Sequence, residues 1–197
     1  MKSTSLPILV TDFDGVMTSQ FSLFDDSGRS HKLIPVNDSL VVKYLCPFVF
    51  SKIIILTAGG NGSGFEITKA RVRDLIKFAG GSIDIHLVKC PSILKYRYIK
   101  TLCDKDRVVY FCDDVTDVLS LTRRHSKLEH VAVPSTSPNI LINLADASID
   151  ISRGGPFFTR ACLSYASKED INAMTDAMLS QSFVYDNLSD YVQEVDV

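Results

Sequence analysis

Short apolar runs alternate along the chain with longer segments whose apolar residues recur at a helical spacing. The runs are almost wholly hydrophobic, as expected for strands covered on both faces of a parallel sheet. Six strands are predicted, at residues 7–11, 52–57, 84–88, 107–112, 130–133 and 148–151. Helices are predicted at residues 39–45, 65–79, 92–103, 115–124 and 138–144. The alternation predicts an α/β fold, with a Rossmann-like parallel sheet sandwiched by helices.

Two helix ends carry local signals. Gly80 and Gly81 follow the second helix and are expected to stop it, because glycine readily adopts the left-handed conformation that ends helices. Ser92 follows Pro91 and is a candidate N-cap for the third helix.

A turn-rich tetrapeptide, Asp25 to Gly28, interrupts the alternation after the first strand. Its flanking segments, 20–24 and 31–36, predict a β-hairpin over about residues 20–36 that projects from the sheet. Because an isolated hairpin is only marginally stable, we expect it to pack against something, such as another subunit.

The composition is that of an ordinary globular protein. Of the 197 residues, 46% are hydrophobic and 22% charged, which excludes a disordered chain, a collagen-like repeat and a coiled coil. The length predicts one domain over residues 1–180, followed by an acidic tail over 181–197. No Lys or Arg follows Lys168, and the net charge of −2 provides no global field to attract nucleic acid.

The cysteines and the N-terminus predict the compartment. The cysteines are odd in number and form no Cys-x-x-Cys pair, which favours reduced thiols in a cytoplasmic protein. They are Cys46, Cys90, Cys103, Cys112 and Cys162. The apolar run 6–10 is too short for a signal peptide or a membrane span, so no membrane association is expected.

The strongest chemical signal is Asp12-Phe13-Asp14-Gly15-Val16-Met17-Thr18, directly after the first strand. Ligands of open α/β sheets bind at the carboxyl ends of the strands. The two-residue period of a strand predicts that Asp12 and Asp14 face the same side while Phe13 points elsewhere. Two crowded carboxylates repel each other unless a cation lies between them, and Mg²⁺ is the simplest such ion. A plain Asp-Gly turn is the alternative, but the whole pattern is far more specific.

At these residues the sequence resembles the haloacid dehalogenase superfamily of phosphotransferases. Residues 12–18 match its first motif, Asp-x-Asp-Gly-x-x-Thr, and Thr57 at the end of the next core strand matches its second. The third motif is a lysine near the start of a later helix, for which Lys95 is the first candidate and Lys89 the second. The fourth is an acidic cluster after the following strand, matched by Asp113, Asp114 and Asp117.

The resemblance implies a phosphatase that works through an aspartyl-phosphate. Asp12 would be the nucleophile, and Asp14 would protonate the leaving alcohol and then activate water. Mg²⁺ would be held by Asp12, by the main-chain carbonyl of Asp14 and by Asp113. Thr57 and Lys95 would bind the phosphoryl oxygens. Taken singly, Thr57 could be an ordinary strand end, Lys95 a solvated side chain, and Asp113 and Asp114 helix N-caps.

Neither interval between the motifs is long enough for a globular cap, so a capless member is predicted. The closest resemblance is to the 3-deoxy-D-manno-octulosonate 8-phosphate phosphatase group, in which a hairpin after motif one helps to build a tetramer. Residues 22–38 are similar to that hairpin. The resemblance implies a homo-oligomer, with a tetramer favoured, and a small phosphorylated sugar or sugar acid as substrate.

Several positions depart from that group. Asn37 stands where the group usually has Arg, Cys112 where motif four begins with Gly, and residues 58–60 read Ala-Gly-Gly where the group reads Gly-Arg. The substrate-binding residues implied by the resemblance are Asn37, Ala58, Gly59 and Arg153. The departures leave open two other functions, a capless phosphatase for nucleic-acid ends or phosphoproteins and a non-catalytic oligomerisation module.

Overall fold

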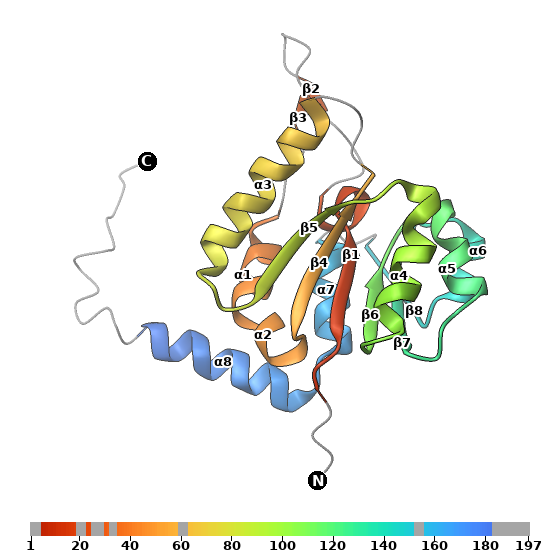
Figure 1. Ribbon diagram of the computed structural model, residues 1–197. Coiled ribbons are helices and arrows are strands. Elements are labelled where there is room, and N and C mark those ends of the chain that lie inside the picture. Colours follow the sequence, from red (N-terminus) through yellow and green to blue (C-terminus); the bar gives the residue numbers. More distant parts are fainter. Residues whose placement is uncertain are drawn as a thin grey trace.

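The computed structural model describes residues 5–18, 23–24, 30–31, 35–58, 63–151 and 156–182. A six-stranded sheet with every strand pair parallel forms its centre, in the order β5-β4-β1-β6-β7-β8 (Figure 1). The strands are β1 (Ile8–Asp12), β4 (Lys52–Thr57), β5 (Asp84–Lys89), β6 (Val108–Phe111), β7 (Leu128–Pro134) and β8 (Ala147–Ile149). The α/β fold and all six predicted strands are confirmed.

The strands are hydrophobic throughout because both faces of the sheet are covered. Leu9 of β1 packs into one apolar core, together with Ile53 and Ile55 of β4. Ile8 and Val10, which alternate with Leu9, pack into a second core on the opposite face. A strand with two buried faces can have few polar positions, which explains the apolar runs.

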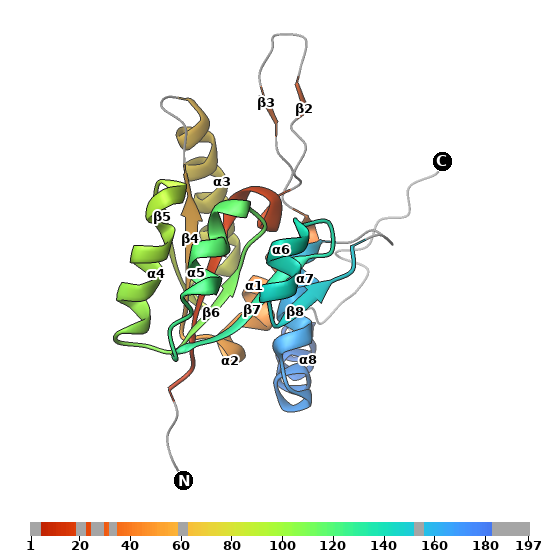
Figure 2. The ribbon, with the colours of Figure 1, turned by 90° about the vertical axis from the view of Figure 1, so that its right-hand side faces the viewer.

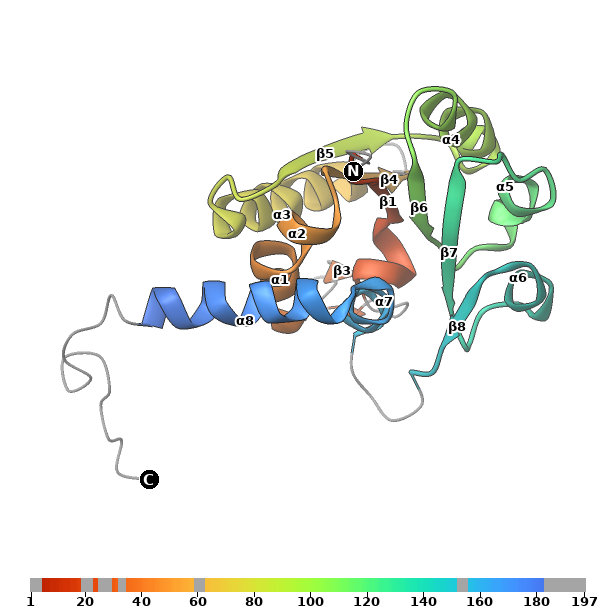
Figure 3. The ribbon, with the colours of Figure 1, turned by 90° about the horizontal axis from the view of Figure 1, so that it is seen from below.

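Helices form a layer on each face of the sheet (Figure 3). One layer contains α1 (Val36–Tyr44), α2 (Cys46–Val49), α3 (Ser63–Ala79), α7 (Phe157–Tyr165) and α8 (Lys168–Ser182). The other contains α4 (Lys95–Cys103), α5 (Val118–Thr122) and α6 (Asn139–Leu144). Single turns of 3₁₀-helix, η2 (Ser92–Leu94) and η3 (Val115–Asp117), precede α4 and α5. A π-helical turn, η1 (Phe13–Met17), follows β1.

The helix ends differ in part from the sequence-based expectations. Gly80 and Gly81, both with positive φ, follow the end of α3 as predicted. The prediction of Ser92 as an N-cap was wrong: Pro91 holds the cap position and Ser92 is the first residue of η2. Pro91 has the extended backbone that a cap position requires, and its side chain makes no capping hydrogen bond.

Three helices, α2, α7 and α8, were not predicted. The helix α2 is a single turn, and Pro47 within it reads as a breaker in sequence, although proline is tolerated in the first turn of a helix. The start of α8 had a readable signal, because Ser167 and Asp170 exchange hydrogen bonds between side chain and backbone as in a capping box.

The predicted hairpin has its two strands at β2 (Leu23–Phe24) and β3 (Ser30–His31), which pair antiparallel. Figure 2 shows them projecting beyond the edge at which β1 and β4 end. The remaining residues of the predicted hairpin before Pro35, and the tail beyond Ser182, lie outside the described residues. The five cysteines are free and buried, in agreement with the prediction of reduced thiols. Within the described part of the chain, no helix has both the length and the apolarity needed to cross a bilayer.

Asp38 on α1 connects the segment after the hairpin to α7. Its Oδ1 accepts hydrogen bonds from the backbone N–H of Thr159, 3.1 Å away, and from the Thr159 hydroxyl, 2.6 Å away. Thr159 lies in the first turn of α7, and Pro156 at the N-cap position makes no side-chain hydrogen bond, so Asp38 caps this helix from another element. Asp38 is fully buried, and its Oδ2 has no hydrogen-bond partner among the described residues. Burial raises the pKa of Asp38 to about 6, against the opposing effect of the two hydrogen bonds.

We predict that Asp38→Asn stabilises the protein above pH 6. The pKa of Asp38 is higher in the folded than in the unfolded state, so its charged form opposes folding as the pH rises through about 6. Removing the charge should raise the free energy of unfolding by up to about 3 kcal/mol at pH 8, with the gain vanishing towards pH 4. Urea unfolding at pH 4, 6 and 8 measures this gain. Asp84→Asn, which removes an exposed carboxylate, is the control and should change stability little at any pH. A gain that does not depend on pH would contradict the prediction.

Candidate active site

A pocket of about 140 Å³ lies where the direction of the chain through the sheet reverses. From β1 the chain passes outward to β4 and β5, then returns to the other side of β1 for β6, β7 and β8. In open α/β sheets this switch point is the usual place for a ligand. The pocket is lined by Asp12, Phe13, Asp14, Leu56, Thr57, Ala58, Ser92, Lys95, Asp113 and Asp114.

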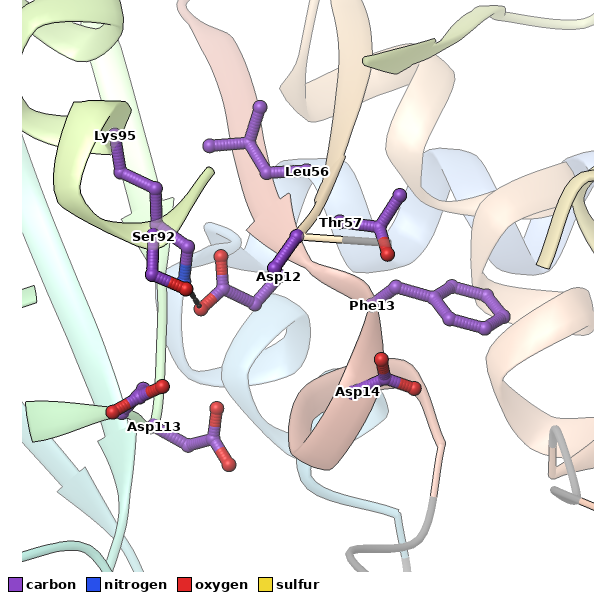
Figure 4. A pocket seen from close by; sticks show the side chains of 10 residues that line it. Asp12, Phe13, Asp14, Leu56, Thr57, Ser92, Lys95 and Asp113 are labelled. Carbon is purple, nitrogen blue, oxygen red and sulfur yellow. Dashed lines mark hydrogen bonds and ion pairs between the residues drawn. The ribbon is translucent and has the colours of Figure 1, made fainter. Parts of the chain in front are cut away.

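The loop after β1 brings its two aspartates to the pocket by a tight turn. The strand ends at Asp12, and Asp14 lies in η1 with an extended backbone (φ −74°, ψ 131°). Asp12 is buried and Asp14 is exposed, and both line the pocket. Phe13 also borders it, but its ring points away and is buried in a core cluster (Figure 4). The turn after β1, rather than strand alternation, places Asp14.

Gly15 allows this turn to approach the fourth motif. Its φ is +80°, a conformation that L-residues with a side chain rarely adopt. A Cβ atom at this position would lie 1.8 Å from Oδ2 of Asp113. Both the backbone conformation and the close approach of Asp113 thus require glycine in the first motif.

Lys95 is the centre of a buried ionic network. Its Nζ lies 2.5 Å from Oδ2 of Asp12 and 3.3 Å from Oδ1 of Asp117. Lys95 begins α4, Asp12 ends β1 and Asp117 ends η3, so the network joins three elements that are distant in sequence. Figure 4 shows Lys95 reaching from α4 to Asp12. Lys95, and not Lys89, is therefore the lysine that meets the predicted nucleophile.

Tyr110 of β6 completes the network by contacting both of its carboxylates. Its hydroxyl lies 2.7 Å from Oδ1 of Asp117 and 3.3 Å from Oδ1 of Asp12. Burial, followed by the charges of Asp12 and Asp117, raises the pKa of Tyr110 well above its usual range, so the hydroxyl keeps its proton and donates. Tyr110 is fully buried and helps to hold Asp12, the predicted nucleophile, in position.

The charges of the network remain unbalanced. Burial alone would lower the pKa of Lys95, but the carboxylates of Asp12 and Asp117 outweigh it and raise that pKa, so the ammonium stays charged. Burial and the nearby Asp117 raise the pKa of Asp12 well above its usual range, against the opposing effect of Lys95. One ammonium is shared by two buried carboxylates. This leaves an excess of negative charge, which a further cation in the pocket would neutralise.

Most of the predicted site residues meet at the pocket. Thr57, which is buried at the end of β4, and the exposed Ala58 line the wall beside Asp12. Asp113 is half-buried and lines the pocket opposite Gly15. Asp114 also lines the pocket but has a structural role as well. It caps η3 by accepting from the backbone N–H of Thr116, as its alternative interpretation proposed.

Other predicted residues lie elsewhere. Asp117 supports Lys95 from behind and does not line the pocket. Asn37, exposed in the first turn of α1, and Lys89, exposed at the end of β5, are not lining residues either. Gly59 and Arg153, both predicted to bind substrate, lie outside the described residues.

Two residues of the site were not predicted. Tyr110 sits in the run Val-Val-Tyr-Phe and reads as one more core residue, because its hydroxyl partners are far away in sequence. Ser92 lines the pocket beside Lys95, where its hydroxyl faces Asp12 (Figure 4). Its position three residues before Lys95, in the turn that leads into α4, was the available signal.

The donor set fits a small hard cation. Among the described residues, no three His, Cys, Asp or Glu side chains form a group that could bind a metal alone. Mg²⁺ does not need such a group, because it keeps several waters and binds proteins through one or two carboxylates. Asp12 and Asp113 supply carboxylates at the pocket, which Asp14 also lines.

We predict that Gly15→Ala damages the site beyond the cost of its backbone strain. The variant must place a side chain at a φ of +80° and displace Asp113. Gly81→Ala is a matched control, because Gly81 has a φ of +79° and nothing within 4 Å of a Cβ atom. Each variant should lose roughly 1–2 kcal/mol of stability from the backbone alone. Gly15→Ala should lose more than Gly81→Ala in urea unfolding and should also lose Mg²⁺ binding in calorimetry. Equal losses of stability with unchanged Mg²⁺ binding would contradict the prediction.

Comparisons with known proteins agree on the fold. No protein-family model matches the sequence, and no curated protein shows significant similarity to it. Solved structures do match. The 3-deoxy-D-manno-octulosonate 8-phosphate phosphatase of Moraxella catarrhalis, in complex with magnesium, phosphate and the sugar acid, has a TM-score of 0.61 at 15% identity. The match covers 89% of this chain and 92% of the Moraxella chain.

Two further enzymes of the same description give similar values. The cobalt-bound phosphatase of Haemophilus influenzae has a TM-score of 0.58 at 18% identity, covering 91% of this chain and 97% of its own. That of Yersinia pestis has a TM-score of 0.58 at 16% identity, covering 86% and 83%. The strand order and these matches show that the chain shares the α/β fold of these phosphatases.

Proposed function

We propose that this protein is a Mg²⁺-dependent phosphomonoester hydrolase that acts through an aspartyl-phosphate. The observation that carries the proposal is the position of Asp12. Its carboxylate lies at the floor of the pocket, held 2.5 Å from Lys95, with Asp14, Thr57 and Asp113 around the same cavity. A buried carboxylate with a fixed orientation, at the carboxyl end of a central strand, suits a nucleophile better than a structural role. The fold shared with octulosonate phosphatases supports this assignment.

The first step transfers the phosphoryl group to the protein. An oxygen of Asp12 attacks phosphorus, and the bond between phosphorus and the alcohol oxygen breaks. Asp14 gives a proton to that oxygen, so the alcohol leaves neutral. Asp14 is exposed while Asp12 is buried, and so the acid can reach the leaving group at the pocket mouth.

The second step releases phosphate and restores Asp12. Asp14, now a carboxylate, takes a proton from a water molecule that attacks phosphorus, and the bond from phosphorus to Asp12 breaks. Throughout, Lys95 supplies a fixed positive charge and Thr57 a neutral hydroxyl beside the phosphoryl oxygens. Tyr110 and Asp117 hold Lys95 and Asp12 in place from behind.

Mg²⁺ would be held by Asp12, Asp113 and the carbonyl of Asp14. When bound, the ion supplies the positive charge that neutralises phosphoryl oxygens and lets two anions approach each other. The raised pKa of Asp12 supports this part of the proposal, because the described lining offers Lys95 as its single ammonium.

A small phosphorylated sugar or sugar acid, such as 3-deoxy-D-manno-octulosonate 8-phosphate, is proposed as the substrate. The support is the sequence resemblance together with the absence of a cap, since only η1, the hairpin strands, α1 and α2 stand between β1 and β4 in the described chain. Five free thiols support a cytoplasmic location.

We further propose that the protein forms a homo-oligomer, with a tetramer favoured. The support is the hairpin, whose strands β2 and β3 project beyond the carboxyl edge of the sheet, on the side of the pocket (Figure 2). Sedimentation equilibrium should give a mass near four times the 21.8 kDa of one chain, and deletion of residues 21–33 should lower it. A monomer at micromolar concentration would exclude this arrangement.

The catalytic proposal predicts that Asp12→Asn abolishes phosphate release without unfolding the chain. The amide keeps the size of the side chain but cannot attack phosphorus, so turnover should fall by at least about a thousandfold. Released phosphate is measured with Mg²⁺ on p-nitrophenyl phosphate and on a panel of sugar, sugar-acid and nucleotide monoesters. Chelation of Mg²⁺ with EDTA should have the same effect, reversibly.

Asp106→Asn, at an exposed position remote from the pocket, is the control for the substitution. Circular dichroism shows whether each variant is folded. Retained turnover in folded Asp12→Asn would exclude Asp12 as the nucleophile. Preference for a 3′-phosphorylated oligonucleotide or a phosphopeptide would move the assignment to another class of substrate. No hydrolysis by the wild type would favour a non-catalytic module.

A further inference from the structure

Lys89 is a basic residue beside the pocket that the proposed chemistry does not use. It is the last residue of β5, and in the parallel register it is the partner of Thr57, which lines the pocket. Paired residues on neighbouring parallel strands point to the same face of a sheet, and the strands lie about 4.8 Å apart. Ile85 and Leu87, which alternate with Lys89, contact the same core as Ile55 of β4. Lys89 therefore projects beside Thr57, on the rim of the site.

The ammonium of Lys89 is held in place by an aromatic ring. Its Nζ lies 5.3 Å from the ring centroid of Phe65, which is in the first turn of α3. A cation over a ring face is attracted by the electrons of the ring, so the long side chain loses part of its freedom. This contact keeps the charge near the start of α3 and the edge where β4 and β5 end.

The described residues offer this charge no ion pair. Glu66, the acidic residue in the first turn of α3, lies 3.9 Å from Lys69. The amino end of the 17-residue α3 carries partial positive charge of its own. With Glu66 paired to Lys69, the ordered ammonium of Lys89 and this helix end form a surface that favours a negatively charged group.

The residues that line the pocket cannot attract a negatively charged group on the leaving group of the substrate. Asp12, Asp14, Asp113 and Asp114 line it, and Lys95 is the one cation in the described lining and is already shared by two carboxylates. An acidic leaving group would be repelled there unless a cation outside the lining bound it. Lys89, one strand away from Thr57, is placed to do so.

We propose that Lys89 is a specificity-determining residue that binds a carboxylate on the leaving group of the substrate. This inference rests on the proposed phosphatase function and deepens it, because it selects acidic sugar phosphates over neutral ones. The phosphate occupies the pocket, and the carbon chain of the leaving group extends over Ala58 towards the end of β5. No bond to Lys89 forms or breaks, so its contribution is to affinity.

The test compares two esters that differ mainly in a carboxylate. 6-Phosphogluconate and glucitol 6-phosphate, two open-chain esters that differ only at C1, are used as competitors of p-nitrophenyl phosphate hydrolysis, which gives an inhibition constant for each whether or not it is itself hydrolysed. The wild type should bind the acidic ester at least about tenfold more tightly than the neutral one. Lys89→Gln should remove about tenfold of this preference, whereas Lys89→Arg should retain it.

Lys100→Gln is the matched control, because it removes an exposed lysine from α4 and should leave the preference unchanged. Equal affinities in the wild type, or an unchanged preference in Lys89→Gln, would overturn the role of Lys89. Failure of the wild type to hydrolyse p-nitrophenyl phosphate would instead overturn the proposed function, and with it the inference. The two failures are therefore distinguishable.

Discussion

The structure of the site depends on one buried ammonium shared by two carboxylates. Lys95 enters a region in which Asp12 is almost fully buried and Asp117 completely so, and removing charges from water is costly. Such a network is stable only when the geometry is good and the remaining polar atoms are satisfied. Here Tyr110 and the backbone N–H of Asp114 donate to Asp117, which leaves the Asp12 carboxylate facing the pocket. The same contacts join β1, β6, η3 and α4. They therefore fix both the orientation of Asp12 and the packing of these elements.

The parallel sheet explains why these groups meet. Every core strand ends at one edge, and the chain leaves β1 in one direction and returns on its other side, so the ends of β4, β1 and β6 are neighbours. Asp12 and Thr57 end β1 and β4, and Asp113 comes two residues after β6, although 101 positions separate Asp12 from Asp113. The fold therefore crowds carboxylates that repel one another, and the ammonium of Lys95 offsets part of this repulsion.

The limits of prediction from sequence follow from the range of each interaction. The strands and the motif residues could be predicted because an unbroken apolar run, followed by acids or a threonine, is a local pattern. Tyr110 could not, because its partners Asp12 and Asp117 become neighbours only when β6 lies beside β1 and η3 turns back. Asp38 was expected only as part of the exit of the hairpin, and its capping of α7 links positions 121 residues apart. The choice between Lys95 and Lys89 also required the structure, because only the folded chain shows that Lys95 at the start of α4, and not Lys89 at the end of β5, reaches Asp12.

The exposed residues beside the pocket differ from the buried ones in how strongly the fold constrains them. Asp12, Lys95 and Asp117 are constrained by one another, and a change in any of them leaves a buried charge without its partner. Ala58 and Lys89 are exposed and take no part in this buried network. Under the proposed function, the buried network would fix phosphoryl transfer, while the preference for a leaving group could change at the ends of β4 and β5.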